Sequence, residues 1–195
     1  SITAYSAAGA RRSEEANSLA NLTVSDAATG AGTTYRFDNA RKDRVLTGEA
    51  GLRGTLQTGA VKHAWVLSAA SFSLEKDNAY VMDWKNTQAT NLYRPVYTGQ
   101  QPAYSADALY GGALSDPRLT GKVRMSSVAI GDTLSVWGDR LQLTLGLRHQ
   151  SMDIANYAYG TAALTDRYDQ SRTSPMAAML YRLSPQWSAY ANYAE

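Results

Sequence analysis

The chain has 195 residues, in which 19 Lys and Arg side chains nearly balance 17 Asp and Glu side chains, for a formal charge of +2. This small charge, without a cluster of basic residues, argues against nucleic acid as a partner. The absence of cysteine excludes disulfides, thiolate metal sites and thiol catalysis. No apolar run approaches the roughly 18 residues that a membrane-spanning helix needs.

The first strand signal follows a long polar stretch. Residues 11–42 are polar, and we expect a long connection there. In residues 45–57 the even positions are apolar or small, whereas the odd positions carry Glu49 and Arg53. Successive side chains of a strand point to opposite faces, so this pattern predicts a strand with one apolar face and one polar face.

A tight hairpin and a second long connection come next. Thr, Gly and Ala at residues 58–60 are typical of a tight turn, which leads into a strand-like segment at residues 61–76. Residues 77–117 are again polar and predict the longest connection of the chain.

The clearest strand lies in the second half of the chain. Residues 118–136 are strand-like, and a Trp-Gly-Asp turn at residues 137–139 follows them. Then four leucines alternate without interruption with polar or small residues, which predicts one face of pure leucine. The leucines are Leu141, Leu143, Leu145 and Leu147, and the residues between and after them are Gln142, Thr144, Gly146 and Arg148.

The chain closes on one more hairpin. Residues 159–169 predict a third long connection, and residues 170–183 form a segment that is mixed on both faces. A Ser-Pro-Gln turn at residues 184–186 joins it to an alternating segment at residues 187–193. The chain begins and ends inside such patterns, so we expect it to be a fragment of a longer protein.

The order of the connections decides between two kinds of β protein. Tight turns alternate with long polar connections, and structureless loops of about 40 residues are uncommon in a compact soluble domain. Outer-membrane barrels have short periplasmic turns and long extracellular loops. The sequence therefore predicts an all-β fold of antiparallel, up-and-down transmembrane β-barrel strands, about seven of them, forming a partial barrel.

The aromatic residues agree with this prediction. The chain has 13 Tyr and 4 Trp but only 2 Phe, a bias toward rings that suit a membrane–water interface. Trp137 and Trp187 lie beside short turns, while Tyr157 and Tyr159 lie where a strand enters a long connection. Composition alone would equally describe a Tyr-rich β protein that is not in a membrane.

Three segments together resemble the barrel of TonB-dependent siderophore receptors. They are residues 51–63, a hairpin in which a Thr-Gly turn is followed by His63, and residues 132–148 and 174–193. The resemblance extends over residues 41–195. It implies a barrel of about 22 strands filled by an N-terminal plug domain, of which residues 1–195 would be a middle portion with the plug domain absent.

The same resemblance implies a function for the parent protein. It would be a receptor in the outer membrane of a Gram-negative bacterium that binds and imports a ferric siderophore by TonB-dependent active transport. Its partners would be the ferric siderophore, the TonB complex acting through the plug, and outer-membrane lipid. The fragment would carry no covalently bound cofactor and would not be an enzyme.

Two groups of residues are candidates for function. Glu49, Arg53 and Arg148 are expected to line the lumen, with Lys122, Arg124 and Asp132 placed there less firmly. They would form salt bridges within a polar wall or, alternatively, attract an anionic iron chelate. The aromatic-rich connection at residues 77–117 is the candidate ligand site, through Tyr80, Trp84, Tyr93 and Tyr97, since rings offer rigid contact area with a polar tip.

No catalytic or metal-binding motif stands out. The two histidines, His63 and His149, have no partner ligands at metal-binding spacing, and no Gly-x-Ser-x-Gly nucleophile motif occurs. Three other functions stay open at this point: a passive outer-membrane porin, an outer-membrane barrel hydrolase, and a soluble β-sandwich interaction module.

Overall fold

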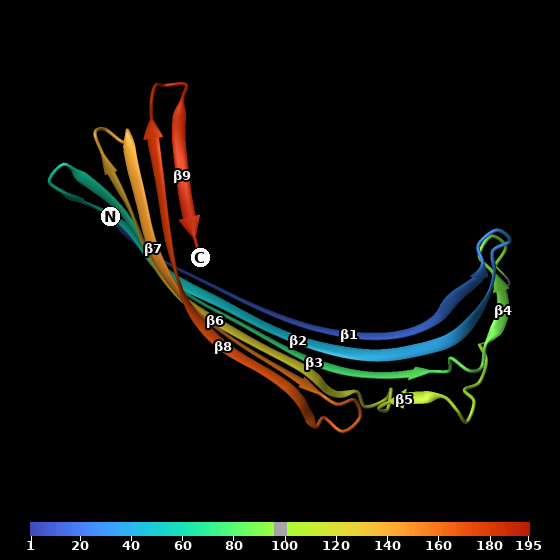
Figure 1. The fold of residues 1–195 in the computed structure, drawn as a ribbon. Helices are drawn as coiled ribbons and strands as arrows, with labels where there is room; N and C mark the ends of the chain where they lie inside the picture. The colour runs from blue at the N-terminus through green and yellow to red at the C-terminus, as the bar shows by residue number, and fades with distance from the viewer. Residues whose placement is uncertain (96–100) are drawn as a thin grey trace.

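Seven long strands form one continuous antiparallel sheet in the computed structural model, which describes residues 1–95 and 101–195 (Figure 1). Each of these strands pairs with the next one along the sheet, in the order β1-β2-β3-β6-β7-β8-β9. Two short strands add to this sheet: β4 pairs with the start of β2, and β5 pairs with the end of β3. The bounds are β1 Ile2–Asp26, β2 Ala31–Thr58, β3 Val61–Met82, β4 Gln88–Asn91, β5 Leu109–Gly111, β6 Arg118–Val136, β7 Leu141–Tyr157, β8 Leu164–Arg182 and β9 Ser188–Ala194.

This up-and-down meander confirms the predicted fold class of a partial antiparallel barrel. None of the described residues forms a helix long and apolar enough to cross a membrane.

The three predicted tight turns lie together at one end of the sheet (Figure 1). Gly59, at φ 61°, closes the turn between β2 and β3. The turn between β6 and β7 has positive φ at Trp137, Gly138 and Asp139, so it reverses the chain within a few residues. Lys62 Nζ lies 3.2 Å from Asp139 Oδ2 and joins these two turns.

Two of the three predicted long connections are wrong in extent. Residues 11–42 are mostly strand, because β1 continues to Asp26 and β2 begins at Ala31, with only a turn between them. The connection predicted at residues 159–169 is also shorter than expected, since β8 already begins at Leu164. The connection between β3 and β6 is long as predicted, and it contains β4 and β5.

Polar cross-strand pairs explain why these strand extensions escaped sequence analysis. Asn17 Nδ2 donates to Asn39 Oδ1 at 3.1 Å, and Asn21 Nδ2 donates to the hydroxyl of Tyr35 at 2.7 Å. Both faces of this region carry polar side chains, so the backbone ladder continues while the apolar alternation that reveals a strand is lost.

The strand register defines two faces, because directly opposed residues of an antiparallel pair share a face. Leu141, Leu143 and Leu147 lie opposite Val136, Leu134 and Ile130 of β6. The same face continues across the whole sheet and is called the apolar band. Its members include Ile2, Ala4, Ala8 and Ala10 of β1; Leu46, Ala50, Leu52 and Leu56 of β2; Trp65, Leu67 and Ala69 of β3; Val128, Ile130, Leu134 and Val136 of β6; the four leucines of β7; and Pro175, Ala177, Met179 and Tyr181 of β8.

Large side chains of the apolar band are exposed in this single-layer sheet. Leu46 is 62% exposed, Ile130 59% and Leu147 51%. Of the described residues, Ala79, Val81 and Ala155 are the buried hydrophobic ones. The apolar band therefore needs an apolar surrounding other than the chain's own core, which lipid hydrocarbon would provide.

The opposite face is called the polar face. It holds Glu49, Arg53 and Arg148, because Glu49 and Arg53 alternate with the apolar residues of β2 and Arg148 directly follows the last leucine of β7. All three predicted lumen-lining residues therefore share one face. Whether that face lines a lumen remains a prediction.

The provisional placement of three further charges is wrong. Asp132, Arg124 and Lys122 lie opposite Leu145, Asp153 and Ala155 on β7, which places them on the face of the apolar band. In residues 118–136 apolar and polar side chains do not alternate regularly, so the sequence alone does not show which side chains share a face. Pairing with β7 assigns them to a face.

The two faces generate a test of the membrane assignment. We expect Leu143→Arg and Leu145→Arg each to weaken insertion of the full-length parent by about 2–4 kcal/mol, the cost of a lipid-facing arginine near the bilayer midplane. Heat-modifiable migration of the membrane fraction would measure insertion. Thr144→Arg, on the polar face between them, is the matched control, and equal losses in all three variants would contradict the assignment.

Candidate functional site

An aromatic cluster lies at the end of the sheet opposite the tight turns. The ring of Tyr80, on β3, stacks on Phe37 of β2 with centroids 6.4 Å apart. It also meets the ring of Tyr159, from the connection between β7 and β8, edge-on at 4.9 Å. Asn78 Nδ2 donates to the Tyr159 hydroxyl at 3.3 Å, which orients that ring. Three parts of the chain thus converge on Tyr80, a surface suited to a bulky ligand.

Glycines make room for this aromatic cluster. A Cβ at Gly111 would lie 2.1 Å from the Tyr80 ring, so only glycine fits beside it. Gly112 and Gly160 both have positive φ, and a Cβ on either would lie 3.2 Å from the other's Cα. The connections that carry Tyr110 and Tyr159 therefore approach each other closely.

The other predicted ligand residues lie apart from this cluster. Trp84 is 53% exposed, and its ring contacts Lys85, whose Nζ lies 5.6 Å from the ring centroid. Tyr93 packs on the turn between β1 and β2, where its hydroxyl donates to the carbonyl oxygen of Ala27 at 2.6 Å. Tyr97 lies outside the described residues. Of the four candidates, Tyr80 is the one that the structure places in the aromatic cluster.

Neither Phe37 nor Tyr159 was among the predicted ligand residues. Phe37 lies in a region taken for a loop, and Tyr159 was taken as a rim aromatic. Their proximity depends on pairing between β2 and β3 and on the meeting of two connections, which no local pattern reveals.

Buried carboxylates fasten the long connection to the sheet. The Asp83 carboxylate, 2% exposed, accepts hydrogen bonds from the Ser105 amide at 2.6 Å and the Ser105 hydroxyl at 2.8 Å. The amide hydrogen bond is the main reason that the pKa of Asp83 lies below its usual value. These bonds hold residues near 105 against the end of β3.

A second anchor joins the same connection to β2. Arg36 donates hydrogen bonds to Asp38 through Nε, at 3.0 and 3.2 Å, and through Nη2, at 2.5 Å. Its Nη1 donates to the Pro102 carbonyl at 3.1 Å. Its guanidinium also lies 4.4 Å from the centroid of the Tyr104 ring. Burial raises the pKa of Asp38, but hydrogen bonds from Arg36 and Ser18 outweigh burial, so this pKa is lowered overall.

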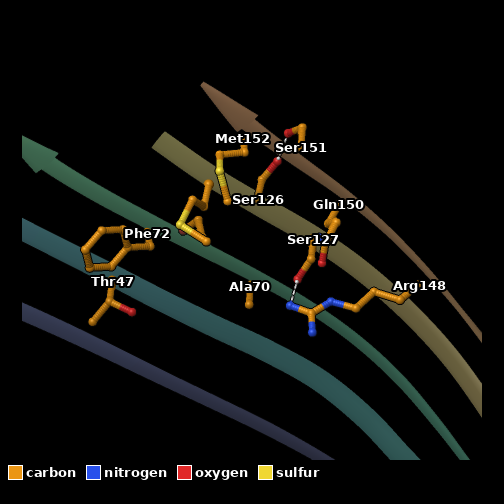
Figure 2. Close-up of a pocket in the computed structure, with 11 residues that line it drawn as sticks. Thr47, Ala70, Phe72, Ser126, Ser127, Arg148, Gln150, Ser151 and Met152 are labelled. Carbon is orange, nitrogen blue, oxygen red and sulfur yellow. Dashed lines mark hydrogen bonds between the residues drawn. The ribbon is translucent and has the colours of Figure 1, made fainter. Parts of the chain in front are cut away.

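The polar face contains a shallow cavity of about 180 Å³ (Figure 2). Arg148 points along it and donates from Nη2 to the Ser127 hydroxyl at 3.2 Å. Phe72, Met125 and Met152 form its apolar part. The cavity therefore combines one cation with apolar surface, beside which a ligand or another domain could pack.

A further ion pair of the polar face was hidden in the region predicted as a loop. Asp43, only 2% exposed, accepts hydrogen bonds from Arg41 Nε at 2.9 Å and Nη2 at 2.5 Å. Arg11 Nη2 lies 4.0 Å from the same carboxylate. This region thus has internally paired charges, whereas no salt bridge within the described residues involves Glu49, Arg53 or Arg148.

A polar pair also lies among the apolar residues of the apolar band. His63 Nδ1 lies 2.7 Å from Asp132 Oδ2, close to the tight turns. Mutual hydrogen bonding reduces the cost of polar groups near lipid. Within the described residues there is no group of three or more His, Asp or Glu side chains placed to hold a metal ion.

Comparison with known proteins identifies the family. Residues 3–195 match the model of the TonB dependent receptor-like β-barrel. The chain belongs to this family. The match includes residues 11–42, which the sequence resemblance had not reached.

Individual relatives of this barrel family are siderophore receptors by name. The ferrichrome receptor FcuA of Yersinia enterocolitica is 28% identical over 193 residues, which are 99% of this chain and 24% of that protein. BauA, the ferric preacinetobactin receptor of Acinetobacter baumannii, superposes with a TM-score of 0.75 at 27% identity, covering 98% of this chain and 27% of that one. The siderophore receptor PiuA of the same organism, at 19% identity, shares the fold with a TM-score of 0.70, covering 99% of this chain and 29% of that one. The chain thus spans about a quarter of the length of these relatives.

The Asp83 anchor predicts a pH dependence. Because its folded-state pKa is lowered, Asp83 stabilises the docked connection above its unfolded value near 4, and this contribution is lost as pH falls through the lower folded pKa. The protection factor of the Ser105 amide, which is the exchange rate of an unstructured amide at the same pH divided by its own, should therefore fall on acidification. Asp83→Asn should lower this protection factor already at neutral pH and flatten its pH dependence, whereas Asp107→Asn in the same connection should behave as wild type.

Proposed function

We propose that the parent of this chain binds a ferric siderophore and imports it by TonB-dependent active transport. The observation that carries this proposal is the match of residues 3–195 to the receptor barrel, together with the names of the relatives that share it. Proteins of this family reside in the outer membrane of Gram-negative bacteria. That location is the one in which an exposed apolar band is stable.

The two faces of the sheet would have different roles in the receptor wall. The apolar band would face lipid, and the polar face would line the lumen, with Glu49, Arg53 and Arg148 exposed to the transported chelate or to a plug domain. A guanidinium suits carboxylate and hydroxamate oxygens, so the two arginines would favour an anionic chelate. Energy from the TonB complex would reach the whole receptor through its plug domain.

The family match separates this proposal from the alternatives. Almost all of this chain aligns with siderophore receptors, which is not expected of a soluble β-sandwich module or of a barrel hydrolase. A passive porin would also have a barrel wall with one apolar and one polar face, but the relatives of this chain are named as receptors for ferric siderophores.

Deletion of the parent gene tests the function directly. Cells without it should lose uptake of at least one radiolabelled ferric siderophore from a panel of hydroxamates, catecholates and mixed chelates, and complementation should restore it. Normal uptake of the whole panel would overturn the proposal.

Tyr80 would be the chain's ligand contact, supported by Phe37 and Tyr159. We expect Tyr80→Ala to weaken chelate binding about tenfold, equivalent to ~1.4 kcal/mol, through loss of ring contacts. Gly111→Ala should have a similar effect, because its methyl group would displace the Tyr80 ring. Binding would be measured by quenching of intrinsic fluorescence.

Trp137→Ala is the control for these variants, since Trp137 is an exposed aromatic residue at the opposite end of the sheet. Wild-type affinity in Tyr80→Ala, while the deletion strain still loses uptake, would reject Tyr80 as a contact but leave the transport function intact.

A further inference from the structure

The face of the apolar band changes character along the strands. Beyond Val128, Leu147 and Pro175, toward the long connections, its next side chains are hydroxyls and one histidine. These are Ser71, Ser126, His149, Ser151, Ser171 and Thr173. Charged side chains follow them on the same face. This order of apolar, hydroxyl and charged side chains parallels the passage from hydrocarbon to headgroups at a bilayer surface.

A cavity of about 190 Å³ opens in the charged zone of this face. Lys122 and Arg124 of β6, Asp153 of β7 and Arg167 of β8 line it, together with apolar side chains such as Leu164. Two carboxylates outside this lining, Glu75 and Asp169, also pair with Lys122 and Arg167, so the charge of these two cations is offset.

The three cations differ in the ion-pair partners that they have within the chain. Arg167 holds Asp153 with two hydrogen bonds, from Nε at 2.9 Å and from Nη2 at 3.1 Å. Lys122 Nζ lies 2.5 Å from Glu75 Oε1. Arg124 is exposed and makes no salt bridge or side-chain hydrogen bond with any described residue, since the carboxylate opposite it, Asp153, is engaged by Arg167. Its guanidinium is therefore available to an anion from outside the chain.

We propose that this cavity binds the phosphate group of a membrane lipid whose acyl chains lie on the apolar band. A guanidinium offers paired N–H donors that match phosphate oxygens, and basic pockets beside lipid-facing surfaces recognise anionic headgroups. Arg124 makes the principal contact, because Lys122 and Arg167 are already paired with carboxylates of the chain.

The position of Arg124 fits a headgroup. It lies four positions before Val128, the last apolar side chain of this face on β6 in that direction, which is roughly 13 Å along a strand. For a strand tilted about 45°, this gives roughly 9 Å of height above the hydrocarbon. The interfacial layer on each side of a bilayer is about 5–8 Å thick, so the backbone of Arg124 lies just above it. Its long side chain can reach back to the level of the lipid phosphates.

This lipid site is independent of the chelate that the parent transports. It lies on the face opposite Arg53 and Arg148, and it requires only that the apolar band meets lipid. Failure of the lipid site would leave the transport proposal unaffected.

The test uses the full-length, delipidated receptor in detergent micelles and two lipids with identical acyl chains, phosphatidic acid and diacylglycerol. Native mass spectrometry would measure the lipid retained. We expect phosphatidic acid to bind at least tenfold more tightly than diacylglycerol, and Arg124→Gln to remove most of this difference. Arg124→Lys should restore part of it, because the charge returns without the paired donors.

Arg172→Gln is the matched control, since Arg172 lies on the same strand as Arg167 but on the polar face. It should bind both lipids as wild type. Equal binding of the two lipids by wild type would overturn the proposal whatever the variants do. Displacement of phosphatidic acid by equimolar inorganic phosphate would also overturn it, because the site would then select the free anion rather than a lipid.

Discussion

Every side chain in this sheet takes its face from the backbone ladder that joins each strand to the next. A shift of one residue between β6 and β7 would exchange the leucine face of β7 for the face that carries Arg148. The register is continuous through the apolar band, so the parity set by the four leucines of β7 extends to β1 on one side and β9 on the other. The separation of an apolar band from a polar face follows from this continuity.

The same ladder extends well past the apolar band into polar sequence. β1 and β2 remain paired up to the turn at residues 27–30, and β3 carries Tyr80 to the far end of the sheet. The candidate ligand surface therefore rests on ordered strands, with Phe37 and Tyr80 held at fixed spacing. The long connection is then fastened by Asp83 and by the Arg36–Asp38 pair, whose burial makes their hydrogen bonds costly to break.

The register of the backbone ladder also decides on which face each charged side chain lies. Arg148 and Arg124 have the same chemistry, but Arg148 faces a cavity of the polar face while Arg124 faces the zone beyond the apolar band. Under the proposed transport function, an arginine on the polar face would meet a transported anion, whereas one on the other face would meet membrane lipid. His63 and Asp132, placed nearer the tight turns on that second face, form a hydrogen bond with each other.

Much of the architecture could be predicted from local sequence. Alternation in residues 45–57 and 141–148 identified strands with one apolar face, and Gly or Pro in turn positions located the three tight hairpins. Together with the family resemblance, these patterns predicted the partial barrel and the common face of Glu49, Arg53 and Arg148. The limit was physical: alternation reveals a strand only where its two faces meet different surroundings. Where both faces of β1 and β2 are polar, and where β6 alternates irregularly, only pairing with neighbouring strands determined the structure. That pairing extended the hairpin, brought Phe37 to Tyr80, and placed Lys122, Arg124 and Asp132 on the face of the leucine strand, while the meeting of two connections brought Tyr159 to Tyr80.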